Sequence, residues 1–116
     1  VPASVDSIPS SAMQEDHVSM GWSAARKLRR AVDGLTRVLA VELVTAARGV
    51  ELRAPLEPGP ATGAVIAALR GGSADRHAVG GPGPDRYLAP DIQAAYEMVR
   101  RGEVVAAAEA VAGPLK

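Results

Sequence analysis

Four consecutive polar side chains, Gln14, Glu15, Asp16 and His17, stand directly before the longest helical pattern of the sequence. A carboxylate at this junction can act as a general base, or it can hold a cationic or N–H group of a substrate. The same residues suit a helix N-terminus, where each acid complements the helix dipole by about 0.3–1 kcal/mol. A metal site is the weakest interpretation, because one His beside two acids lacks the i, i+4 spacing of a helical zinc site. Spacing alone favours the helix start and leaves the catalytic role open.

Three other polar features could form sites. Glu42 lies close to an apolar helical stripe, so it needs either a structural partner, such as an Arg from a neighbouring helix, or a role in a site. The basic side chains of residues 26–30 share one side of the helix, which is typical of a solvated face and less so of a nucleic-acid contact. His77 stands in a glycine-rich stretch, and no specific contact is expected for it.

A long helix is predicted to carry the polar motif of residues 14–17. Apolar residues recur at steps of three and four, which is the helical period: Leu28, Val32, Leu35, Leu39, Leu43 and Ala46. Between residues 38 and 47 the pattern is apolar almost all round, which predicts burial on more than one side. Residues 16–48 as one helix would span roughly 50 Å. A compact globule of this size is only about 35 Å across, so other chain segments or subunits should cover the helix.

The helix start and the division of the chain follow from capping patterns. Ser11 and Gln14 have capping-box spacing, which places the first helical turn near Ala12, and Asp16 is a competing cap. The predicted fold class is all-α: one long helix plus shorter C-terminal helices, forming a segment of a larger helical-bundle enzyme. No complete independent domain is expected. The expected parts are an extended entry segment, the long helix with the motif and a C-terminal helical region: 1–13, 14–50 and 51–116.

Shorter helices are predicted after a proline-rich linker. Residues 64–70 form the first, and a glycine-rich loop over residues 71–86 should be flexible. Pro90 suits the first turn of the next helix, which Gly102 is placed to end. An Ala/Val-rich helix over residues 103–112 comes last.

Composition narrows the class of protein. The 13 basic and 13 acidic residues balance, which removes the simplest argument for a nucleic-acid or anionic-membrane partner. The chain has no Cys, which excludes disulfides and thiolate sites and fits a cytoplasmic protein. No apolar run approaches the roughly 20 residues that a membrane helix needs. The first residues lack the pattern of a signal peptide and an initiator Met, so a piece of a longer protein is expected.

Three stretches carry a resemblance to a known family. They resemble, in chain order, the C-terminal portion of the histidine ammonia-lyases, within the aromatic amino-acid ammonia-lyase family. The three stretches are VDSIPSSAMQEDHVSMGWSAARKL, LAVELVTAARGVELR and DRYLAPDI. The resemblance runs from Val5 to about Val105, and the Gln-Glu-Asp-His-Val-Ser-Met string is specific to the histidine branch. Ser10 and Met13 are mild departures from the family pattern.

The resemblance implies an activity and a site. The activity is non-oxidative deamination of L-histidine to urocanate and ammonia, and no metal is expected. The family's electrophile, methylidene-imidazolone (MIO), forms from an Ala-Ser-Gly, which this chain lacks, so it must form outside the chain. The family's substrate-facing carboxylate corresponds to Glu15, and Gln14 and His17 correspond to supporting residues. The family's homotetramer, with sites built from several subunits, would account for the long apolar helix.

Two functions from different classes therefore remain. The first is the C-terminal part of a histidine ammonia-lyase, a carbon–nitrogen lyase, which is expected to be inactive as this chain alone. The alternative is a truncated, non-catalytic helical interaction or structural module derived from the lyase family. A nucleic-acid binder that uses residues 26–30 is a weaker third hypothesis.

Overall fold

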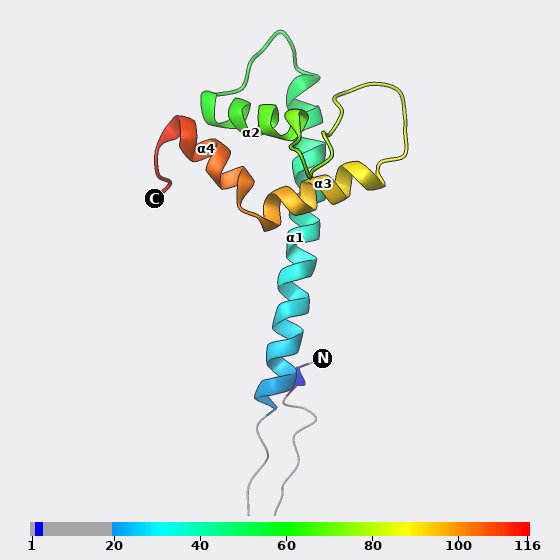
Figure 1. Cartoon of the computed structure of the whole chain (residues 1–116), viewed down its shortest axis with the longest axis vertical. Coiled ribbons are helices and arrows are strands. Elements are labelled where there is room, and N and C mark those ends of the chain that lie inside the picture. The colour runs from blue at the N-terminus through cyan, green and yellow to red at the C-terminus, as the bar shows by residue number, and fades with distance from the viewer. Residues whose placement is uncertain (1, 4–19) are drawn as a thin grey trace, which may run out of the picture. The chain divides into compact units, whose positions relative to one another are not determined.

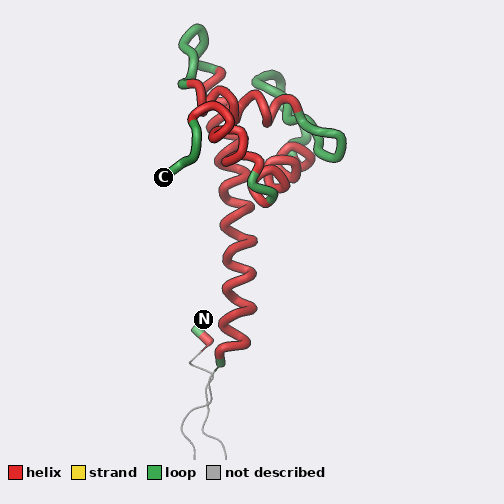
Figure 2. Tube along the Cα trace, turned by 60° about the vertical axis from the view of Figure 1, so that its left-hand side comes forward, coloured by secondary structure: helices red, strands yellow, loops and turns green. Residues whose placement is uncertain are grey.

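The computed structural model describes residues 2–3 and 20–116 (Figure 1). Helices dominate this part of the chain: α1 (Gly21–Glu51), α2 (Pro60–Gly71), α3 (Ala89–Arg100) and α4 (Glu103–Ala112). The described residues form no strand and only one isolated bridge, between Ser73 and Arg76 (Figure 2). The predicted all-α class is confirmed. The chain divides into two compact units, residues 1–35 and 36–116, which are described separately.

The first unit contains the N-terminal half of α1. The carbonyl of Met20 accepts the first helical hydrogen bond, from the Ala24 amide, at 3.0 Å. Arg26 lies over the Trp22 ring, with 5.4 Å between the guanidinium carbon and the ring centroid. All of residues 26–30 are exposed, as expected for a solvated face. The helix start that was predicted near Ala12 lies outside the described residues.

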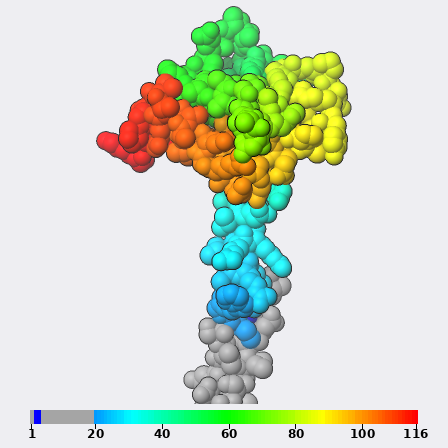
Figure 3. Space-filling model, in the orientation of Figure 1, coloured from blue at the N-terminus to red at the C-terminus, as the bar shows by residue number. Residues whose placement is uncertain are grey.

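The second unit has a small core built from α1, α2, α3 and the segment after α2, and partly buried Val104 of α4 packs against it. Its buried members are mostly small side chains: Ala40, Ala47, Leu69, Val79, Ala94, Ala95 and Met98. Small residues let helices approach closely but bury little area each. α4 packs on α2 and touches α3, and Figure 3 shows α2, α4 and the segment after α2 together on one face of this unit. The core therefore relies on close helix approach more than on bulky side chains.

Local chemistry sets the helix boundaries. α2 begins at Pro60, earlier than predicted, because proline suits the first helical position and the linker therefore ends there. Gly102 adopts φ +76° between α3 and α4, which confirms it as the residue that ends α3. α4 covers the predicted residues 103–112.

The apolar flanks of α1 are not covered by the described part of the chain. Val38 is 62% exposed and Val41 is 47% exposed, whereas only Ala40 and Ala47 of α1 are buried. The predicted burial on more than one side is therefore absent from the described part of the chain. Whatever buries these flanks must come from outside that part.

Candidate functional site

The predicted site residues Gln14, Glu15 and His17 lie outside the described residues. His17 precedes the first residue of α1, Gly21, by four positions in the sequence. The roles assigned to these three side chains consequently stay predictions. The described part of the chain shows two further polar arrangements, one at Asp91 and one at Glu42.

Asp91 is a buried carboxylate that receives three side-chain donors. It stands in the first turn of α3 and is only 3% exposed. His77 Nε2 lies 2.9 Å from one carboxylate oxygen. Arg86 donates to the other oxygen from Nη2 at 2.8 Å and from Nε at 3.2 Å. Both oxygens of the carboxylate are thus occupied.

The charge of Asp91 is stabilised in place. Burial raises the pKa of the Asp91 carboxyl, but hydrogen bonds from Arg86 and His77, with the Arg86 charge, outweigh that effect and hold the pKa below its usual value. The positive end of α3 favours the same ionised form. The ionised Asp91 therefore binds two side chains of the segment that joins α2 to α3.

Arginine side chains fasten the same segment through its backbone carbonyls. Arg70 Nη1 donates to Val79 O at 3.1 Å and to Gly80 O at 2.8 Å. Arg86 Nη2 also donates to Gly80 O, and Arg76, which is 8% exposed, donates to Ala68 O. The flexible loop predicted over residues 71–86 is in fact tied down at several points. Sequence reasoning missed this, because bonds from a guanidinium to distant carbonyls leave no periodic signal.

The expectation that His77 makes no specific contact was wrong, yet its pairing does not make a catalytic centre. A His–Asp pair orients a nucleophile only when the second ring nitrogen meets a hydroxyl or thiol. No described hydroxyl or thiol bonds to His77, and its only side-chain hydrogen bond within the described part of the chain is the one to Asp91. The described residues also contain no cluster of three or more His, Cys, Asp or Glu that could hold a metal. The arrangement around Asp91 is structural.

Glu42 lies at an open apolar groove of the second unit. The groove has a volume of about 400 Å³, and α1, the end of α3 and α4 supply its walls. We define this Glu42 groove by its lining residues: Leu39, Glu42, Leu43, Ala46, Val99, Gly102, Val104 and Val105. Glu42 is exposed and forms no ion pair with any described residue, so the predicted structural Arg partner is not found among them.

Comparison with known proteins decides the family. Residues 1–71, more than half of the chain, match the family model described as aromatic amino acid lyase. The chain belongs to the aromatic amino acid lyase family. The matched range includes the Gln14–His17 motif, all of α1 and all of α2.

The most similar relatives all carry one name. The histidine ammonia-lyase of Streptomyces griseus is 66% identical over 99% of this chain, and that of Streptomyces coelicolor is 64% identical over the whole chain. In both cases the match covers 22% of the relative, so the chain spans about a fifth of the length of the curated relatives.

Solved structures of this lyase family share the fold. Histidine ammonia-lyase from Trypanosoma cruzi superposes with a TM-score of 0.79 at 36% identity, covering 94% of this chain and 20% of that one. Tyrosine aminomutase from Streptomyces globisporus gives 0.76 at 36% identity, covering 91% of this chain and 19% of that one. Within the described residues, no helix is long and apolar enough to span a membrane.

Proposed function

We propose that this chain is the C-terminal part of a histidine ammonia-lyase, acting on L-histidine to release ammonia and urocanate. The observation that carries the proposal is the identity of 64–66% to histidine ammonia-lyases over 99–100% of this chain. The solved lyase with a TM-score of 0.79 supports it independently of the motif.

Within that enzyme, Glu15 is the proposed catalytic carboxylate, and Gln14 and His17 position the motif. A carboxylate can take the proton that the elimination removes from the substrate, or it can hold the substrate's amine or imidazole. MIO would supply the electrophile for the elimination. The chain contains no Ala-Ser-Gly, so the rest of the enzyme must provide that group. A cytoplasmic homotetramer is the proposed form of the whole enzyme.

The experiment supplies the rest of the enzyme as a separate chain. The chain is co-produced with the remaining portion of the Streptomyces griseus histidine ammonia-lyase, and urocanate formation from L-histidine is followed by ultraviolet absorbance. We expect no activity from the chain alone and clear activity from the pair. Glu15→Gln should lower kcat/KM at least about a hundredfold, equivalent to about 2.7 kcal/mol of transition-state stabilisation.

Asp16→Asn is the matched control, because it removes an adjacent carboxylate without touching Glu15. It should change kcat/KM by less than about fivefold, which corresponds to about 1 kcal/mol. Full activity of the Glu15→Gln pair would mean that the motif residues serve only as a helix start. A folded pair without any urocanate would favour the non-catalytic helical module instead.

A further inference from the structure

The Glu42 groove combines an apolar lining with a single charged side chain. Its walls come from three helices, yet Leu39 remains 40% exposed and Val105 49% exposed. Apolar surface arranged as a groove between helices is the shape that receives a further amphipathic helix. The described residues do not provide one.

Glu42 has no counter-ion on its own helix. The positions three and four residues away carry no basic side chain: Val38, Leu39, Thr45 and Ala46. Helical neighbours at these spacings are the ones that could pair with it. A segment that filled the groove would cover Glu42, and a carboxylate buried without a partner is strongly destabilising. The occupant must therefore bring a positive charge to this point.

The length of the relatives indicates where the occupant comes from. The matched histidine ammonia-lyases are more than four times as long as this chain, since the match covers 22% of each of them. The same polypeptide thus offers ample chain outside these residues. An intramolecular occupant would also have a high effective concentration at the groove.

We propose that the Glu42 groove docks an amphipathic helix from the part of the lyase polypeptide outside these 116 residues, and that a Lys or Arg of that helix pairs with Glu42. The proposal rests on the proposed function, because it takes the missing chain to be a histidine ammonia-lyase. It adds a specific contact that holds this chain to the rest of the enzyme.

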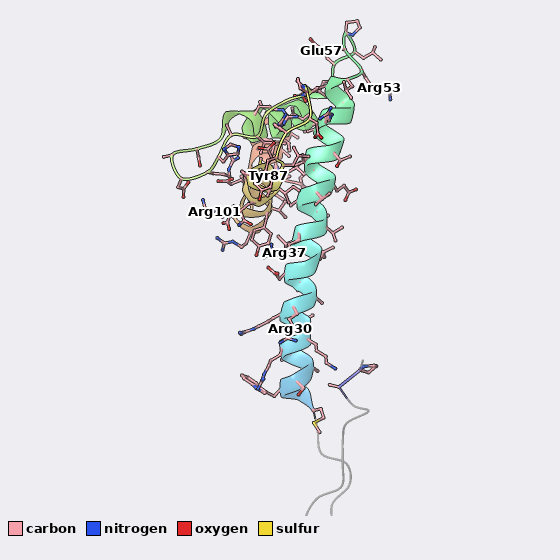
Figure 4. The ribbon with its side chains drawn as sticks, turned by 90° about the vertical axis from the view of Figure 1, so that its right-hand side faces the viewer. Arg30, Arg37, Arg53, Glu57, Tyr87 and Arg101 are labelled. Carbon is pink, nitrogen blue, oxygen red and sulfur yellow. The ribbon has the colours of Figure 1, made fainter. Side chains whose placement is uncertain are left out.

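The test measures assembly and needs no catalysis. The chain is co-produced with an affinity-tagged remaining portion of the Streptomyces griseus histidine ammonia-lyase, and the chain recovered with the tag is quantified. Glu42→Arg places like charges together and should lower recovery more than about tenfold. Glu57→Arg is the control, because Glu57 is an exposed carboxylate in the loop after α1 (Figure 4) and should change recovery less than about twofold.

A cross-link identifies the occupant. A benzophenone amino acid in place of Val105 should cross-link to a peptide of the tagged lyase portion that contains Lys or Arg. Unchanged recovery of Glu42→Arg, or cross-links only to a second copy or to another protein, would overturn the proposal. Circular dichroism checks that Glu42→Arg keeps the helix content of the parent chain. Assembly without urocanate would contradict the proposed function alone, whereas urocanate from the Glu42→Arg pair at full yield would contradict this inference alone.

Discussion

Asp91 illustrates how one buried carboxylate can organise a long connecting segment. Its oxygens face His77 and Arg86, two residues that stand fourteen and five positions earlier in the chain. Arg86 in turn donates to Gly80 O and Gly81 O, so the charge on Asp91 fixes the side chain that holds the backbone. Charged hydrogen bonds of this kind are stronger than neutral ones and restrict geometry more tightly. Asp91 should therefore matter to stability.

Asp91→Asn keeps the shape of the side chain but removes its charge. The amide cannot accept all three donors, so the unfolding free energy should fall by about 2 kcal/mol. Urea unfolding followed by circular dichroism measures the loss. Asp85→Asn serves as control, because among the described residues exposed Asp85 accepts only from the Arg86 amide, and the substitution should cost less than about 0.5 kcal/mol. Equal losses from the two variants would rule out the anchoring role.

The contribution of Asp91 should disappear in acid. Its pKa is lowered in the folded chain, so as the pH falls the unfolded chain binds the proton first. The difference in unfolding free energy between the parent chain and Asp91→Asn should have its full value above about pH 5, because that pH lies above the usual aspartate pKa of about 3.9. It should shrink as the pH falls through the folded-state pKa. A series of urea unfolding curves checks this, and a gap independent of pH would contradict it.

At the scale of elements, the sequence predicted the features that near neighbours determine and missed those that long-range contacts determine. Three-and-four spacing predicted the helix whose described part is α1, and the positions of Pro90 and Gly102 bounded α3. These signals act between near neighbours and can be found in any sequence. The segment after α2 has no such signal, because Arg70 and Arg86 fasten it by contacts that only the folded chain brings together. The motif residues are a different case: Gln14, Glu15 and His17. Spacing left their role open, and only the family resemblance assigned them a role in a site.

Gly72 tests how closely that segment is packed. It has φ +65°, and a Cβ there would lie 2.9 Å from Ala78 Cα and from Ala78 N. Gly72→Ala should therefore destabilise the chain by about 3 kcal/mol through strain and overlap. Gly71→Ala is the matched control, because Gly71 ends α2 with nothing within 4 Å of its Cβ position. The control should be neutral or stabilising by up to about 1 kcal/mol in urea unfolding. A tolerated Gly72→Ala would contradict the described packing.

For the whole molecule, the exposed apolar residues matter more than any single contact. Side chains of α1 that follow the helical period are more than half exposed: Leu28, Val32, Leu35 and Val38. Exposed apolar side chains that repeat at the helical period mark an interaction site or an aggregation hazard. The chain spans 22% of the length of its relatives. Under the proposed function, the chain that covers this surface belongs to the rest of the enzyme.

Light scattering should accordingly show that the chain alone forms polydisperse aggregates at high concentration, whereas the urea unfolding series above are run in dilute solution. Co-production with the remaining portion of the Streptomyces griseus lyase should convert it to one species of defined mass, because the apolar side chains of α1 are then buried. The double variant Leu28→Gln, Leu35→Gln separates the two effects, since both residues are exposed in this chain. It should aggregate less when alone and assemble less well with the lyase portion, each by losing apolar area. A parent chain that is monodisperse at monomer mass would instead support the self-sufficient helical module.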